Sequence, residues 1–213
     1  MTTPSSASTF SRGTELALQK NPDVEGWDIE LVIEDTQGTP EQGAAVANKL
    51  SADGQIVGVV GHTFSGSTEV AIPIYDDAGI VMVSTPPLPI PRWLRSALAS
   101  LTVSASQTRC RRSLRPKYIY EELGINKLAT MHDGGAYGKG LADLTAEMFE
   151  SLGGTVVGSE AITPGETDYS APLAAIDSLD PGLIYYGGYA ADAAVLVDQM
   201  PAAGLDGVML LRL

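Results

Sequence analysis

The stretch Gln55–Ser84, "QIVGVVGHTFSGSTEVAIPIYDDAGIVMVS", decides the fold. It contains the near-continuous apolar run Ile56–Val60, which is typical of a strand buried on both faces. A segment with helical character follows, and "GIVMVS" is a second strand candidate. A strand, a helix and a second strand in succession predict an α/β unit with parallel strands.

The same alternation extends through the rest of the chain. Further strands are expected at "WDIELVIED" (residues 27–35), "KLATMHD" (127–133), "TVVGSEAI" (155–162), "LIYYGG" (183–188) and "GVMLL" (207–211). Together with the helices between them, they predict an α/β fold with largely parallel sheets. The first recognisable element, however, is the helix "RGTELALQKN" (residues 12–21). Such sheets normally begin with a strand, so we expect the chain to start late and to lack its first strand.

Three helices carry sequence signals at their ends. Thr39 is the expected N-cap of one, with Pro40 at its first position and Gln42 completing a capping box. A second stops at a glycine pair, residues 153–154, and a third at Pro201. The apolar side chains on one face of the second helix are Leu141, Leu144, Met148 and Leu152.

Composition bounds the classes of function. The chain has 213 residues, 44% of them hydrophobic and 18% charged, which are globular values. A formal charge of −13 argues against nucleic acid or an anionic membrane as the main partner. A single cysteine, Cys110, excludes an internal disulfide and a cysteine-based metal cluster. No run is apolar enough to insert into a membrane, and the amino terminus does not read as a signal peptide.

The glycine-rich segment "HDGGAYGKGLAD" (residues 132–143) does not match a nucleotide-binding motif. No Ser or Thr follows Lys139, as a phosphate-binding P-loop requires, and Asp143 stands where a dinucleotide motif needs its third glycine. The segment instead predicts a turn from a strand into a helix. That turn holds Tyr137 at the carboxyl edge of the sheet, where α/β proteins bind ligands.

Ser65, Gly66, Ser67 and Thr68 are expected at the amino terminus of a helix. The N–H groups and the helix dipole there favour an anion such as a carboxylate. Ordinary N-capping by a hydroxyl explains the same residues without a ligand, and both interpretations stay open. The segment is no nucleophile elbow, because Thr63 replaces the first glycine of G-x-S-x-G.

Other polar residues predict no chemistry. His62 and His132 each follow a strand without a second ligand at metal spacing, so we assign no metal. The acidic pairs at residues 34–35 and 76–77 fit solvent-facing ends of elements. Aromatic residues at the end of another expected strand suit the wall of a small-molecule pocket: Tyr185, Tyr186 and Tyr189. We find no catalytic residues, and we expect no enzyme activity and no cofactor.

Four long segments, in order, resemble the leucine/isoleucine/valine-binding proteins, the extracytoplasmic solute-binding components of branched-chain amino-acid ABC transporters. They are "VVGHTFSGST…IPIYDDAGIVMVS", "HDGGAYGKGLAD", "ITPGETDYSA" and "IYYGGYAADAAVL". The resemblance implies a type I periplasmic-binding fold, whose two lobes close over an amino acid in the cleft between them. It also implies an ABC permease as partner and a periplasmic or extracytoplasmic location.

The resemblance assigns roles to individual residues. Ser65 and Gly66 would bind the α-carboxylate of the ligand, and Tyr137 and Tyr189 would close on it from the second lobe. The family's Ala-Thr pair after the "VMVS" strand is replaced here by Pro87 and Leu88, so that hydroxyl is absent. The family carboxylate that pairs with the ligand's ammonium would lie beyond Leu213. We therefore expect a truncated member, whose ability to bind is reduced.

The segment 86–116 departs from the acidic character of the chain. No Asp or Glu occurs between Asp77 and Glu121. Within this gap lie seven of the 13 basic residues: Arg92, Arg95, Arg109, Arg111, Arg112, Arg115 and Lys117. A basic, proline-rich arm that binds an acidic partner is one explanation.

A shifted reading frame is the explanation that we favour. Pro87–Leu94 can be encoded CCG CTA CCA ATC CCG CGC TGG CTN, and regrouping by one base yields Ala-Thr-Asn-Pro-Ala-Leu-Ala, the missing family motif. Gln107–Arg111 likewise regroups to Asp-Ala-Val-Gln. The resemblance then divides the chain into an incomplete first lobe, residues 1–105, and a more complete second lobe, residues 106–213. A ligand-sensing regulatory domain of the same fold and, less favoured, a nucleotide-using Rossmann-like enzyme remain as alternatives.

Overall fold

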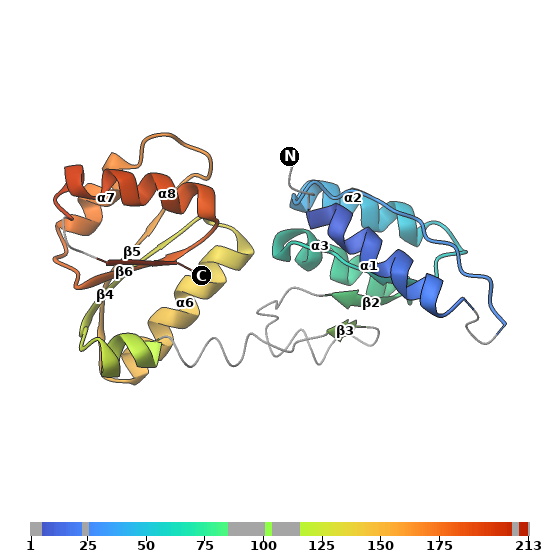
Figure 1. The fold of residues 1–213 in the computed structure, drawn as a ribbon, viewed down its shortest axis with the longest axis horizontal. Helices are drawn as coiled ribbons and strands as arrows, with labels where there is room; N and C mark the ends of the chain where they lie inside the picture. Colours follow the sequence, from blue (N-terminus) through green and yellow to red (C-terminus); the bar gives the residue numbers. More distant parts are fainter. Residues whose placement is uncertain (1–5, 23–25, 85–100, 104–115, 206–208, 213) are drawn as a thin grey trace. The chain divides into compact units, whose positions relative to one another are not determined.

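A computed structural model describes residues 6–22, 26–84, 101–103, 116–205 and 209–212. The chain divides into two compact units, residues 1–104 and 105–213 (Figure 1). Most of the basic segment 86–116 lies outside the described residues.

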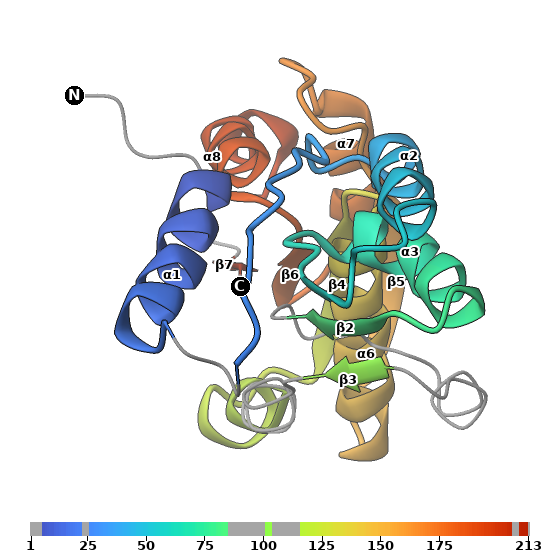
Figure 2. The ribbon, with the colours of Figure 1, turned by 90° about the vertical axis from the view of Figure 1, so that its right-hand side faces the viewer.

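The first unit consists of α1 (Ser6–Lys20), α2 (Pro40–Ser51), β1 (Gly58–Val60), α3 (Ser65–Asp77), β2 (Val81–Ser84) and β3 (Leu101–Val103). Its strands form a parallel sheet in the order β1-β2-β3. Helices α2 and α3 lie side by side (Figure 2), so closely that a Cβ atom on Gly43 would lie 2.7 Å from Cβ of Ser67. Glycine at position 43 therefore permits this helix pair to form.

The core of the first unit lies between these two helices and one face of the sheet. The expected N-cap of α2 is confirmed: the Thr39 hydroxyl accepts a hydrogen bond from the Gln42 N–H at 3.3 Å. The buried apolar residues of this core are Val46, Ala47, Leu50, Ala71, Ile72, Tyr75, Ile80 and Met82.

Two expectations for the first unit are wrong. The run Ile56–Val60 is not buried on both faces, because Val57 is 82% exposed and Val60 is also exposed. The register pairs Val59 with Met82 on the face that the core covers, and Val60 points to the other face. Residues 27–35 form no described strand beyond an isolated bridge at Trp27, whose side chain is 71% exposed.

The described part of the second unit has as its first element a π-helical turn, η1 (Tyr118–Glu122). It continues with β4 (Lys127–His132), α6 (Ala136–Ser151), β5 (Thr155–Ala161), α7 (Ser170–Asp177), β6 (Leu183–Gly187), α8 (Ala190–Gln199), a 3₁₀ turn η2 (Pro201–Ala203) and β7 (Met209–Arg212). The strands form a parallel sheet in the order β5-β4-β6-β7. Strands, helices and parallel sheets thus confirm the predicted α/β fold class.

Residues of β4 and β6 alternate between two separate cores. Ala129, Met131, Ile184 and Tyr186 pack on the side of α7 and α8. Leu128, Leu183 and Tyr185 pack with Phe149 of α6 on the other side. Helices therefore cover both faces of this sheet, as its apolar strands require (Figure 1).

The buried stripe of α6 is shifted by about one position from the apolar face that the sequence shows. The buried stripe is Gly138, Ala142, Thr145 and Phe149, whereas Leu141, Leu144 and Met148 are only partly buried. The helix approaches the sheet so closely that a Cβ atom on Gly138 would collide with the carbonyl oxygen of Gly187. Small residues mark this contact, and a search for large apolar side chains overlooks them. The helix ends predicted at the glycine pair 153–154 and at Pro201 are confirmed to within a few residues.

Candidate functional site

The start of α3 carries the first group of candidate residues. Ser65 and Gly66 are its first two residues, and Ser65 is buried. The first N–H groups of any α-helix have no partner within the helix. The structure thus places Ser65 and Gly66 where the backbone favours an anion.

Ordinary N-capping is not what the hydroxyls at this helix start do. The N-cap residue is Phe64, which makes no side-chain cap hydrogen bond. The Ser67 hydroxyl donates to the Phe64 carbonyl at 3.0 Å, and the Thr68 hydroxyl lies 2.8 Å from the same oxygen and 3.1 Å from the His62 carbonyl. The Ser65 hydroxyl makes no hydrogen bond with another described residue. These contacts hold the first turn of α3, and the role of Ser65 stays a prediction.

His62 contacts α3 through the side chain of Tyr75. Its Nε2 lies 3.2 Å from the Tyr75 hydroxyl, and both side chains are buried. Burial lowers the pKa of His62 from 6.5 to about 4 and raises the pKa of Tyr75 to about 12. Both groups are therefore neutral near pH 7, which agrees with the structural role expected for His62.

Tyr137 and Tyr189 form the second group of candidate residues. Tyr137 is the second residue of α6, and Tyr189 is the N-cap of α8. The structure brings their rings together, with centroids 5.8 Å apart and planes inclined at 31°. Tyr189 is 42% exposed, so the pair presents an aromatic surface where α6 and α8 begin, beyond the carboxyl ends of β4 and β6.

A buried carboxylate lies close to this aromatic pair. Asp133 follows β4, and its Oδ1 accepts a hydrogen bond from the Gly135 N–H at 2.9 Å. Burial raises the pKa of Asp133, and the charge of Asp192 raises it further, against the effect of that hydrogen bond. Burial, Asp133 and Tyr137 together raise the pKa of the Tyr189 phenol. The negative charge of Asp133 therefore acts on Tyr189 of the aromatic pair.

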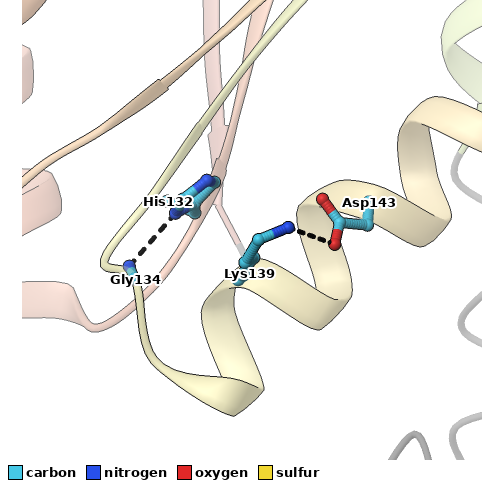
Figure 3. A network of polar contacts seen from close by, with 4 residues as sticks. All are labelled: His132, Gly134, Lys139 and Asp143. Atoms are coloured by element: carbon cyan, nitrogen blue, oxygen red, sulfur yellow. Dashed lines mark hydrogen bonds and ion pairs between the residues drawn. The ribbon is translucent and has the colours of Figure 1, made fainter.

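The turn into α6 is otherwise held by surface contacts (Figure 3). His132 Nδ1 accepts a hydrogen bond from the Gly134 N–H at 3.1 Å, and Lys139 pairs with Asp143 at 2.6 Å. Lys139 thus neutralises a neighbour in its own helix. This arrangement agrees with the expectation that the glycine-rich segment is a strand-to-helix turn.

The remaining acidic candidates have structural partners. Glu34 pairs with Lys49 at 2.7 Å, and Asp35 accepts a hydrogen bond from the Gln37 N–H. The other pair, residues 76–77, ends α3 as expected. Among the described residues, no group of three or more His, Cys, Asp or Glu side chains could hold a metal ion.

Sequence reasoning missed Asp192 and Tyr169, two buried polar residues of the second unit. The Tyr169 hydroxyl donates to Asp192 Oδ1 at 2.9 Å, across 23 positions of the chain. No short motif signals such a pair. A buried position for an acidic residue in the first turn of α8 is evident only after the helix has been placed on the sheet.

Comparison with known proteins gives a consistent result. The family model for periplasmic binding proteins matches residues 1–212. The Leu/Ile/Val-binding protein homolog 1 of Brucella abortus is 32% identical over 199 residues, which cover 92% of this chain and 53% of the relative. An amino acid binding protein of Pseudomonas aeruginosa is 35% identical over 182 residues, covering 85% of this chain and 48% of the relative. The chain therefore spans about half the length of these curated relatives.

Solved structures share the fold. A leucine binding protein from Thermotoga maritima superposes with a TM-score of 0.80 at 23% identity, covering 100% of this chain and 60% of that one.

In the described part of the chain, no helix is both long and apolar enough to cross a membrane.

Proposed function

The chain belongs to the periplasmic binding protein family, and on this premise we propose that it functions as a solute-binding protein, which captures a small amino acid, branched-chain or related, for an ABC permease. The relatives are named as binding proteins for Leu, Ile and Val or for amino acids. Their role is to bind a solute, which requires no catalytic residue. A periplasmic or extracytoplasmic location follows from the same proposal.

The Tyr137–Tyr189 pair is the observation that carries this proposal. Two aromatic rings 5.8 Å apart offer an apolar surface for an aliphatic side chain. Their position at the carboxyl edge of a parallel sheet is where α/β proteins bind ligands. In this proposal, Ser65 and Gly66 supply the contact for the α-carboxylate, through the hydroxyl and the N–H groups at the start of α3.

Thermal denaturation of the full chain tests the proposal. We expect L-leucine, L-isoleucine or L-valine in excess to raise the midpoint, since a ligand at about 100 times its Kd stabilises a protein by about 2.7 kcal/mol. Ser65→Ala should reduce this shift. Ser170→Ala is the matched control, because Ser170 is likewise the first residue of a helix. Stabilisation by NAD and not by any amino acid would contradict the proposal in favour of a nucleotide-using enzyme.

We also infer that residues 86–116 are read in a shifted frame. Strand β3 lies within this segment and pairs in parallel with β2, Leu101 opposite Met82. Because strand pairing uses backbone groups, this contact is compatible with either reading frame. The nucleotide sequence from Gln55 onward decides the question. One-base shifts near Pro86 and Pro116 would support the inference, whereas codons that do not regroup would make the basic segment an evolved arm.

A further inference from the structure

A buried polar network joins the loop between β5 and α7 to the first turn of α8. Asp192 is the third residue of α8 and is only 6% exposed. Its Oδ1 accepts a hydrogen bond from the Gly165 N–H at 2.8 Å and one from the Tyr169 hydroxyl at 2.9 Å. One carboxylate oxygen thus fixes two points of the loop, in the helix turn where a negative charge is also favoured by the helix dipole.

The same loop is also bound to the last residue of α8. Gln199 Oε1 accepts a hydrogen bond from the Tyr169 N–H at 2.7 Å, and its Nε2 donates to the Thr167 carbonyl at 2.8 Å. The ring of Tyr169 is buried in the core on this side of the sheet. Asp192 and Gln199 therefore make two hydrogen bonds each to one loop, at opposite ends of one helix.

Only the Asp192 end carries a candidate binding residue. Tyr189 is the N-cap of α8, three positions before Asp192, so the placement of the first turn sets the direction in which the Tyr189 ring leaves the helix. Its partner Tyr137 is fixed independently. At the start of α6, a Cβ atom on Gly138 would collide with the Gly187 carbonyl oxygen, and a Cβ atom on Gly187 with that of Gly138. Helix α6 thus packs directly on β6.

We propose that Asp192 is a positioning residue for the Tyr137–Tyr189 pair: its carboxylate ties the β5–α7 loop to the first turn of α8 and thereby holds the Tyr189 ring against Tyr137. The importance of this contact for ligand affinity rests on the proposed function. The contact itself does not, and it can be measured without a ligand.

The test reports on Tyr189 directly. The full chain is labelled with 3-fluorotyrosine, and the Tyr189 signal in the fluorine NMR spectrum is identified by its loss in Tyr189→Phe. Titration of this signal gives the pKa of the Tyr189 phenol, which burial, Asp133 and Tyr137 raise. Asp192 is not among these causes, and Asp192→Asn, which removes its charge but keeps an oxygen acceptor, separates loss of charge from movement of the ring.

We expect Asp192→Ala to lower the pKa of the labelled Tyr189 toward that of free 3-fluorotyrosine. Gln199→Ala, the matched control, removes the same number of hydrogen bonds from the other end of α8 and should leave this pKa unchanged. Asp192→Asn retains Oδ1 as an acceptor and should keep the pKa raised. If Asp192→Ala does not fold, Tyr169→Phe removes one of the two hydrogen bonds and should give a smaller shift in the same direction.

An unchanged pKa of Tyr189 in a folded Asp192→Ala chain would overturn the proposal, as would an equal shift in Gln199→Ala. A titration with L-leucine separates this outcome from failure of the proposed function. If the unsubstituted chain binds leucine, Asp192→Ala should bind it roughly 10-fold more weakly, because about that factor corresponds to the loss of one hydrogen bond to a charged group. If no chain binds leucine, the amino-acid proposal fails, and the pKa of Tyr189 still decides whether Asp192 positions the pair.

Discussion

Acid should destabilise the first unit through a single buried histidine. The pKa of His62 is lowered from 6.5 to about 4 because burial disfavours the imidazolium. The unfolded chain therefore binds this proton more readily than the folded chain does. The contribution of neutral His62 to stability is fully present above pH 6.5 and is lost as the pH falls toward about 4.

The size of the effect follows from the two pKa values. Between about pH 7 and about pH 5, the difference in proton binding lowers the free energy of unfolding by about 2 kcal/mol. A typical domain has only about 5–15 kcal/mol in total, so the loss is measurable. Tyr75, the hydrogen-bond partner of His62, stays neutral throughout this range because its pKa is about 12.

Urea unfolding at a series of pH values measures this loss. The NMR signals of the backbone amides of α2 and α3 follow the unfolding of the first unit. We expect the unsubstituted chain to lose about 2 kcal/mol relative to His62→Gln between these pH values. His132→Gln, which removes the other histidine of the chain, is the control. Parallel pH profiles for the unsubstituted chain and His62→Gln would refute the reasoning.

Three further predictions concern packing and surface charge. Gly138→Ala should destabilise the second unit by about 1–3 kcal/mol in chemical denaturation, because its Cβ would meet the Gly187 carbonyl. The control is Gly13→Ala in α1, whose Cβ would meet no atom within 4 Å and which should not destabilise the chain. Hydrogen exchange should be slower for amides of β4 and β6 than for those of β1, since only the former strands are covered on both faces. Lys139→Ala should change the unfolding free energy by no more than about 0.5 kcal/mol, because its pair with Asp143 is exposed.

Local sequence signals predicted those elements whose stabilising contacts are themselves local. The Thr39 cap, the start of α3 at Ser65 and the end of α8 before Pro201 depend on residues within a few positions of one another. The joining of Tyr137 to Tyr189 was also foreseeable in part. Residues that follow neighbouring parallel strands meet at the same sheet edge, whichever loop carries them.

Expectations that depended on distant partners were less successful. The pattern at residues 27–35 favours a strand, but a strand also needs a neighbouring strand, and propensity does not supply one. Gly138 became recognisable as a core position only when α6 was placed on β6. Asp192 and Gly165 lie 27 positions apart, and neither belongs to a motif that indicates their hydrogen bond.

The two groups of candidate residues are held by contacts from different units of the chain. The contacts described above for Tyr137 and Tyr189 come from residues 133–199, within the second unit. The contacts described around Ser65 come from residues 43–75 of the first unit, which also carries most of the exposed large apolar side chains among the described residues. A shifted frame in residues 86–116 would thus leave both sets of contacts in place. Its cost should therefore appear in ligand affinity and in the stability of the first unit, and not in the geometry of the tyrosine pair.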